Sequence, residues 1–199
     1  MTKTEEWLAG ARSAVPIMLG YVPVGIAYGV MARQAGLNTW QTVLMSLTVY
    51  GGASEMMAAG MVAQGAAVLT IVLTTFILNL RHIIMSTCVF NQMQGGRLPV
   101  RMLAAFGVTD ETFAVYTTTA NAPRTPRYFF SMALCSYLSW ALGSWLGAIA
   151  TGLLPPLITA ALGISLYAMF IGLLMPGLRG NGRLAALVVL TALCNTVLC

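Results

Sequence analysis

The chain has 199 residues, of which 58% are hydrophobic and 8% are charged, and its formal net charge is +5. Because an ordinary soluble domain carries about 25% charged residues, the composition excludes that class and indicates an integral membrane protein. The basic residues stand singly or in pairs between apolar runs, which indicates membrane topology and no nucleic-acid partner. The four cysteines lie in apolar surroundings without metal-ligand spacing, so we expect neither a metal site nor a cofactor.

Apolar runs of about 17–25 residues predict an all-α, polytopic bundle of about six to seven membrane-spanning helices. We expect residues 1–199 to form a single transporter domain, with an amphipathic lead at 1–12 and a first helix at 13–32. Within that helix, Pro23 and Gly25 are candidates for a break that serves gating. The alternative is that glycine and proline are simply common in membrane helices.

The second apolar run, residues 40–63, has two adjacent glycines at its centre, followed by Ser54 and Glu55. Gly51 and Gly52 predict a helix break that frees backbone groups to line a polar cavity. The alternative is close helix packing at the small residues, with Glu55 held as a neutral acid.

The third run, residues 66–90, carries Asn79, Arg81 and His82 near its middle. An Arg at mid-membrane depth costs about 2.5–3.5 kcal/mol on insertion scales, so a buried Arg81 needs a partner. In the alternative, a short or tilted helix lets Arg81 reach the interface.

The fourth run, residues 102–120, supplies the candidate partners in Thr109, Asp110 and Glu111. Thr and acids also favour an ordinary helix start, but residues 112–120 alone are too short to cross, so we expect the acids near the midplane. Neighbouring helical positions point about 100° apart, so the two acids can serve different partners. Glu55 with these two acids outnumbers Arg81, so at least one carboxyl is expected to be protonated or to meet a cation, as in a transporter.

The remainder of the chain predicts a loop at 121–127, helices at 128–150 and 157–175, and a short or incomplete last helix at 184–199. The distribution of Lys and Arg favours a cytoplasmic amino terminus, with Arg124 and Arg127 inside and Arg97 and Arg101 outside. A weak sequence similarity between residues 46–54 and 136–144 suggests a 3+3 inverted repeat of helices.

Taken together, the residues that we expect to bind substrate or protons are Gly51, Gly52, Ser54, Glu55, Asn79, Arg81, His82, Thr109, Asp110 and Glu111. These groups favour secondary transport of a small zwitterionic amino acid, coupled to protons. Two alternatives from other classes remain: a packing subunit whose polar residues fix helix register, and an intramembrane serine hydrolase that uses Ser54 and His82.

Four motifs in fixed order give the chain a family resemblance: GYVPVGIAYG at 20–29, YGGASE at 50–55, NLRH at 79–82 and GVTDETF at 107–113. Over residues 13–183 it resembles the AzlC family of branched-chain amino acid exporters. The resemblance implies a bacterial inner-membrane permease, not an enzyme, that exports valine, leucine, isoleucine and in some members methionine. It also implies a small AzlD-type membrane subunit as partner. Glu55 departs from the Gln that is common in the family, and the carboxy-terminal apolar sequence is shorter than usual.

Overall fold

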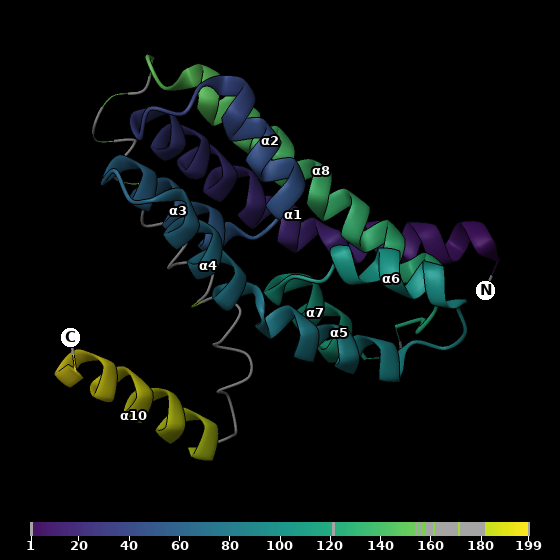
Figure 1. Ribbon diagram of the computed structural model, residues 1–199. Coiled ribbons are helices and arrows are strands. Elements are labelled where there is room, and N and C mark those ends of the chain that lie inside the picture. The colour runs from purple at the N-terminus through teal and green to yellow at the C-terminus, as the bar shows by residue number, and fades with distance from the viewer. Residues whose placement is uncertain are drawn as a thin grey trace. The chain divides into compact units, whose positions relative to one another are not determined.

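The computed structural model describes residues 2–120, 122–153, 155, 157, 161, 171 and 182–198, and the regular elements among them are all α-helices (Figure 1). By its internal contacts the chain divides into residues 1–165 and 166–199. In the second unit the structure describes α10 (Gly182–Leu198), which accounts for the expected last helix. Of the helix expected at 157–175, the structure describes only residues 157, 161 and 171. The prediction of an all-α membrane protein is confirmed.

Two long helices, α1 (Lys3–Gln34) and α8 (Pro126–Ala150), pack along each other in the first unit. They are parallel, because Ser131 Oγ donates to the Trp7 carbonyl over 2.6 Å near the start of both helices, and Gly29 lies against Ser144 toward the end of both. Glycines allow this close approach: a Cβ on Gly25 would meet the Trp140 carbonyl oxygen at 3.0 Å. Helix α1 begins ten residues earlier than expected and runs unbroken through Pro23 and Gly25, so the break proposed there is wrong.

The second apolar run forms two short helices, α2 (Thr39–Val49) and α3 (Gly52–Ala63). The predicted break is confirmed: Tyr50 adopts a left-handed conformation, with φ 47° and ψ 49°, and Gly51 is extended. Each helix is about 17 Å long at 1.5 Å per residue, which is about half of the hydrocarbon core.

The third run forms α4 (Val68–Asn79) and α5 (Arg81–Gln92), joined through a single residue, Leu80, that keeps helical backbone angles. The pair therefore acts as one kinked helix of 25 residues, long and apolar enough to cross a membrane, as are α1 and α8. After α5, the Gln94 amide donates to the Arg124 carbonyl over 2.6 Å, which places the loop at 93–97 beside the start of α8.

These contacts define the two ends of the bundle. End A holds the starts of α1 and α8 and the loops at 93–97 and 119–125, and end B holds the loops at 35–38 and 64–67. Because α2 starts at end B and α4 leaves from end B, the α2–α3 segment enters the bundle and returns. We name residues 39–63 the first hairpin; the expectation that this run crosses once is wrong. The side chains agree, since Met45 of α2, Ala58 of α3 and Ile71 of α4 line one common cavity, so the three helices lie side by side.

The fourth run behaves in the same way from the other end. Helix α6 (Leu98–Phe106) leaves the loop at 93–97, the chain turns at residues 107–109, and α7 (Asp110–Thr118) returns to the loop at 119–125 (Figure 1). We name residues 98–118 the second hairpin, and the expectation of a single crossing at 102–120 is also wrong. The run cannot cross once because the loop before α6 and the loop after α7 lie together at end A, where the Gln94 amide bonds to the Arg124 carbonyl.

The first unit thus contains a spanning helix followed by a re-entrant hairpin twice, in opposite orientations. The N-cap residues of the two returning helices, Gly51 and Thr109, are 58 positions apart. The 3+3 inverted repeat stays a prediction, because most of its sixth helix lies outside the described residues. The return of the second hairpin also places Arg97 and Arg101 at end A, with Arg124 and Arg127. The prediction that these two pairs lie on opposite sides of the membrane is therefore wrong.

Candidate functional site

The tips of the two hairpins meet in the middle of the bundle against α1. The ring of Tyr50, at the first tip, lies 5.9 Å from the ring of Phe106 at the second, and 6.4 Å from that of Tyr21 on α1. Two helices therefore begin near the bundle centre, and the exposed N–H groups at a helix start favour negative charge. Non-helical backbone at this depth is tolerated where protein or a water-filled cavity covers it.

The start of α7 is fixed by its own threonines and by Tyr21. Thr109 and Thr112 form reciprocal cap contacts, with the Thr109 amide 2.8 Å from Thr112 Oγ1. Tyr21 O–H donates to Glu111 Oε2 over 2.6 Å and lies 2.7 Å from Thr109 Oγ1. Glu111 is 6% exposed, so its carboxyl group is held by hydrogen bonds and has no cationic partner in the described part of the chain.

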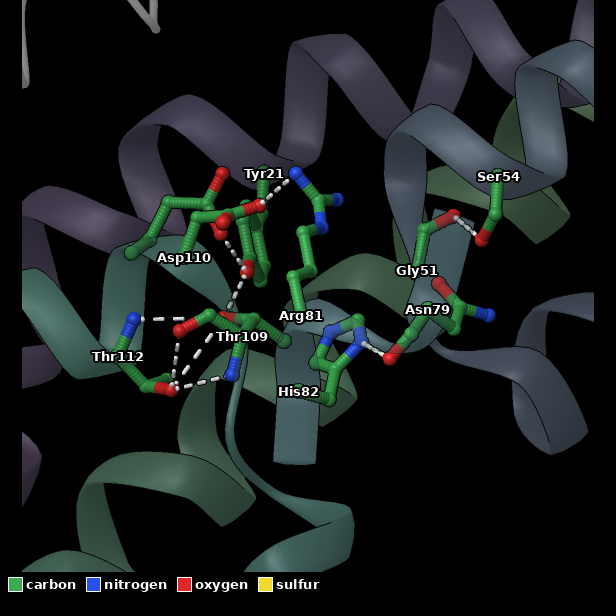
Figure 2. A network of polar contacts seen from close by, with 10 residues as sticks. Tyr21, Gly51, Ser54, Asn79, Arg81, His82, Thr109, Asp110 and Thr112 are labelled. Atoms are coloured by element: carbon green, nitrogen blue, oxygen red, sulfur yellow. Dashed lines mark hydrogen bonds and ion pairs between the residues drawn. The ribbon is translucent and has the colours of Figure 1, made fainter. Parts of the chain in front are cut away.

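Asp110 forms an ion pair with Arg81 at the kink of the spanning helix. The distance from Arg81 Nη1 to Asp110 Oδ2 is 3.0 Å, and Figure 2 shows the guanidinium reaching across to the α7 start. The side chains are 39% and 29% exposed, so both charges remain accessible to a ligand. The two adjacent acids serve different partners, as helical geometry requires.

Glu55 forms a third acidic position, at the start of α3, and is fully buried. Its Oε1 accepts from the Gly51 amide over 3.0 Å and its Oε2 accepts from Trp140 Nε1 over 3.3 Å. A buried carboxylate without a cation is costly, so Glu55 and Glu111 each call for a proton or a positively charged ligand group.

Several buried polar atoms near the kink have no hydrogen-bond partner among the described residues. They are Tyr50 Oη, Asn79 Oδ1 and Arg81 Nε. The Asn79 amide lies beside Gly51, where an added Cβ would be 3.3 Å from Asn79 Oδ1. Because buried polar groups are almost always satisfied in proteins, such a cluster indicates a place for a polar ligand or water.

Ser54 and His82 lie apart in Figure 2, each bonded within its own segment. Ser54 Oγ donates to the Gly51 carbonyl over 2.9 Å, and His82 Nδ1 lies 3.0 Å from the Asn79 carbonyl oxygen. No hydrogen bond joins them in the described structure, so the geometry gives no support to a serine–histidine hydrolase. His, Cys, Asp and Glu side chains form no group of three or more over the same residues, and we assign no metal site.

The structure therefore gathers the candidate residues at two adjoining places. Arg81, Thr109, Asp110 and Glu111 surround the start of α7, while Gly51, Gly52, Ser54, Glu55 and Asn79 surround the start of α3. Pro23 and Gly25 belong to the continuous α1 helix, and Gly25 packs against α8. Sequence reasoning did not assign Tyr21, Tyr50 and Trp140 to the site, because aromatic residues are common in apolar runs and no local pattern sets these three apart.

A family comparison agrees with this geometry. The model of the AzlC protein family matches residues 16–154, which include both hairpins and every residue of the site. This chain belongs to the AzlC family.

Three relatives give the extent of the AzlC similarity. An uncharacterized membrane protein of Archaeoglobus fulgidus is 33% identical over 94% of this chain and 82% of its own length. The inner membrane protein YgaZ of Escherichia coli is 30% identical over 85% of this chain and 72% of its own length. The branched-chain amino acid transport protein AzlC of Bacillus subtilis is 27% identical over 75% of this chain and 61% of its own length. No solved structure matches the chain.

Proposed function

We propose that this AzlC family member is a secondary transporter that exports branched-chain amino acids in exchange for protons. The observation that carries the proposal is the Arg81–Asp110 ion pair, which is accessible and lies between the kink of a spanning helix and the start of α7. A zwitterionic amino acid needs an anionic partner for its ammonium group and a cationic or helix-start partner for its carboxylate. Asp110 and Arg81 supply one of each, and the name of the Bacillus subtilis relative supports the substrate class.

Proton coupling is supported by the two acids that lack a cation. Glu111 and Glu55 are buried at the starts of α7 and α3, where an ammonium group or a proton satisfies the charge. When the substrate ammonium leaves, a proton takes its place. We propose Asp110 and Glu111 as the acids that exchange protons and Arg81 as the substrate carboxylate's partner.

Orientation and partner complete the proposal. Among the described residues of the first unit, more basic side chains lie at end A than at end B. End B has Arg33, and end A has Lys3, Arg12, Arg97, Arg101, Arg124 and Arg127. By the positive-inside rule, end A and the amino terminus face the cytoplasm of a bacterial inner membrane. The partner that the family resemblance implies is a small AzlD-type membrane subunit.

The test uses proteoliposomes that contain the purified protein, with and without a co-expressed small subunit. Vesicles loaded with labelled valine are diluted into buffer with or without a pH gradient. We expect the gradient to accelerate valine efflux and Asp110→Asn to abolish that acceleration. A Thr48→Val control removes a hydroxyl that bonds only to its own helix, at an exposed position, and should behave as the original protein. Efflux that ignores the gradient in both the original protein and Asp110→Asn would contradict proton coupling.

A further inference from the structure

We propose that the apolar cavity between the second hairpin and α8 holds the branched side chain of the substrate, and that Leu103 helps to set the accepted size. The inference rests on the proposed function and extends it. The cavity has a volume of about 220 Å³ and is lined by aromatic and aliphatic residues, among them Tyr50, Leu103, Phe106, Gly107, Leu134 and Tyr137.

The cavity adjoins the polar site through both hairpin tips. Tyr50 lies at the first tip and is 3% exposed, and its ring packs against those of Phe106 and Tyr137 at 5.9 and 4.9 Å. Gly107 lies at the second tip, three residues before Asp110, and its carbonyl accepts from Thr112 Oγ1. The cavity wall therefore includes one residue from each hairpin tip, Tyr50 and Gly107, and these tips also hold the polar site.

A buried polar atom without a partner strengthens this assignment. Tyr50 Oη forms no hydrogen bond among the described residues, although its ring forms part of the cavity wall. The hydroxyl can bond to the α-amino or carboxylate group of a substrate whose side chain lies against the ring. A second cavity, lined by residues of α2, α3 and α4, includes Glu55 and Ser54, whose side chains already have partners.

Size and polarity give the ligand class. An apolar cavity of about 150 Å³ stays dry and accepts benzene, so 220 Å³ is ample for a branched alkyl group of three or four carbons. The lining contains no charged residue, so a charged or strongly polar side chain loses its hydration without compensation. Apolar pockets discriminate by about 10–200-fold for each methylene group, so the walls can rank alanine, valine and leucine.

The experiment changes one exposed wall residue and measures selectivity. Leu103 is 61% exposed, so a Leu103→Trp change narrows the cavity without filling a packed core, and Leu103→Ala widens it. Met102, the preceding residue, is 67% exposed and outside the cavity lining, so Met102→Trp is the matched control. The readout is the ratio of the alanine and leucine concentrations that halve labelled-valine efflux from proteoliposomes.

We expect Leu103→Trp to shift this ratio at least tenfold against leucine, while Met102→Trp leaves it within twofold. Leu103→Ala should shift it toward larger side chains, including phenylalanine. An unchanged ratio in both Leu103 variants, beside a functioning original protein, would overturn the inference and assign the cavity to lipid or to a partner helix. If the original protein neither binds nor transports any amino acid, the proposed function itself fails, and this inference fails with it.

Discussion

The ion pair between Arg81 and Asp110 joins a spanning helix to the tip of a re-entrant hairpin, with 3.0 Å between the charged atoms. A zwitterionic ligand carries one positive and one negative group. Its carboxylate can pair with Arg81 and its ammonium group with Asp110, so the ligand can separate the ion pair without leaving either side chain unpaired. The second hairpin would then lose one of its contacts with α5 while the ligand is bound. This exchange gives a physical route by which occupancy of the site changes the position of a hairpin.

The first prediction concerns the strength of this ion pair. Arg81→Gln and Asp110→Asn should each destabilise the protein, whereas the double variant should recover part of the loss because it leaves no unpaired charge. We expect a coupling free energy on the order of 0.5–3 kcal/mol from a double-mutant cycle of unfolding in detergent.

The control pair is Glu6 and Arg127, which are 3.7 Å apart, with Arg127 50% exposed at end A. Its cycle should give a smaller coupling free energy, because the 3.7 Å distance is too long for a hydrogen bond between the charged groups. Strictly additive effects at Arg81 and Asp110 would show that the two charges do not interact and would remove the basis of the exchange.

The second prediction concerns the re-entrant hairpins. The structure places Leu37 and Gln64 at end B and Gln94 at end A. Single cysteines at these three positions, in a background with the native cysteines replaced by serine, should react with a membrane-impermeant maleimide from two different sides. Leu37→Cys and Gln64→Cys should label from the same side and Gln94→Cys from the opposite side. Labelling of Gln64→Cys and Leu37→Cys from opposite sides would mean that the first hairpin crosses the membrane.

The sequence predicts the first helix break, but for residues 102–120 it favours one continuous helix over a helix start at Thr109, and it does not predict the course of the chain after each break. Gly51 and Gly52 mark the first break because glycine lacks a Cβ, and Thr109 marks the second because threonine caps a helix start. A broken run of 24 residues has enough length to cross the membrane or to enter and return. That choice depends on contacts between distant segments, such as the Gln94–Arg124 backbone bond, which no local pattern contains.

The acidic and basic members of the site were predictable, whereas the aromatic ones were not. Arg81, Asp110 and Glu55 are conspicuous because charge is costly within apolar sequence. Tyr21 and Trp140 are unremarkable in membrane helices, and their contacts with Glu111 and Glu55 arise only when α1 and α8 pack on the hairpins. The same holds for the cavity, since Leu103 and Leu134 come from elements that meet only in the folded chain.

The third prediction concerns the close packing of α1 on α8. A Cβ on Gly29 would clash with the Ser144 carbonyl oxygen, whereas a Cβ on Gly60 would meet no atom within 4 Å. We therefore expect Gly29→Ala to destabilise the protein by about 1–3 kcal/mol through overpacking. Gly60→Ala lies inside α3 and should be neutral or stabilising by up to about 1 kcal/mol, because alanine favours the helix.

Both glycine variants are compared with the original protein by thermal unfolding in the same detergent. The two changes add the same methyl group, so differences in hydrophobicity cancel and the surroundings decide the sign. Equal midpoints for Gly29→Ala and the original protein would contradict the backbone contact between α1 and α8.

The fourth prediction concerns Glu55, the buried acid at the start of α3. Glu55→Gln keeps the size of the side chain and an oxygen that can accept from the Gly51 amide, but its amide nitrogen cannot accept from Trp140 Nε1. The loss of one hydrogen bond should cost about 0.5–1.5 kcal/mol, so the fold is retained. Since Gln removes a group that can bind a proton, valine efflux should continue with a changed dependence on pH.

The measurement is the initial rate of valine efflux from proteoliposomes between pH 5.5 and 8.5, with no gradient. A Trp140→Phe variant serves as control, because it removes the same hydrogen bond and leaves the acid in place. If the altered hydrogen bond were responsible, both variants would change the pH profile alike. If the carboxyl group takes up a proton during transport, only Glu55→Gln will change the profile. Superimposable profiles for Glu55→Gln and the original protein would exclude Glu55 as a proton site and leave Asp110 and Glu111 to fill that role.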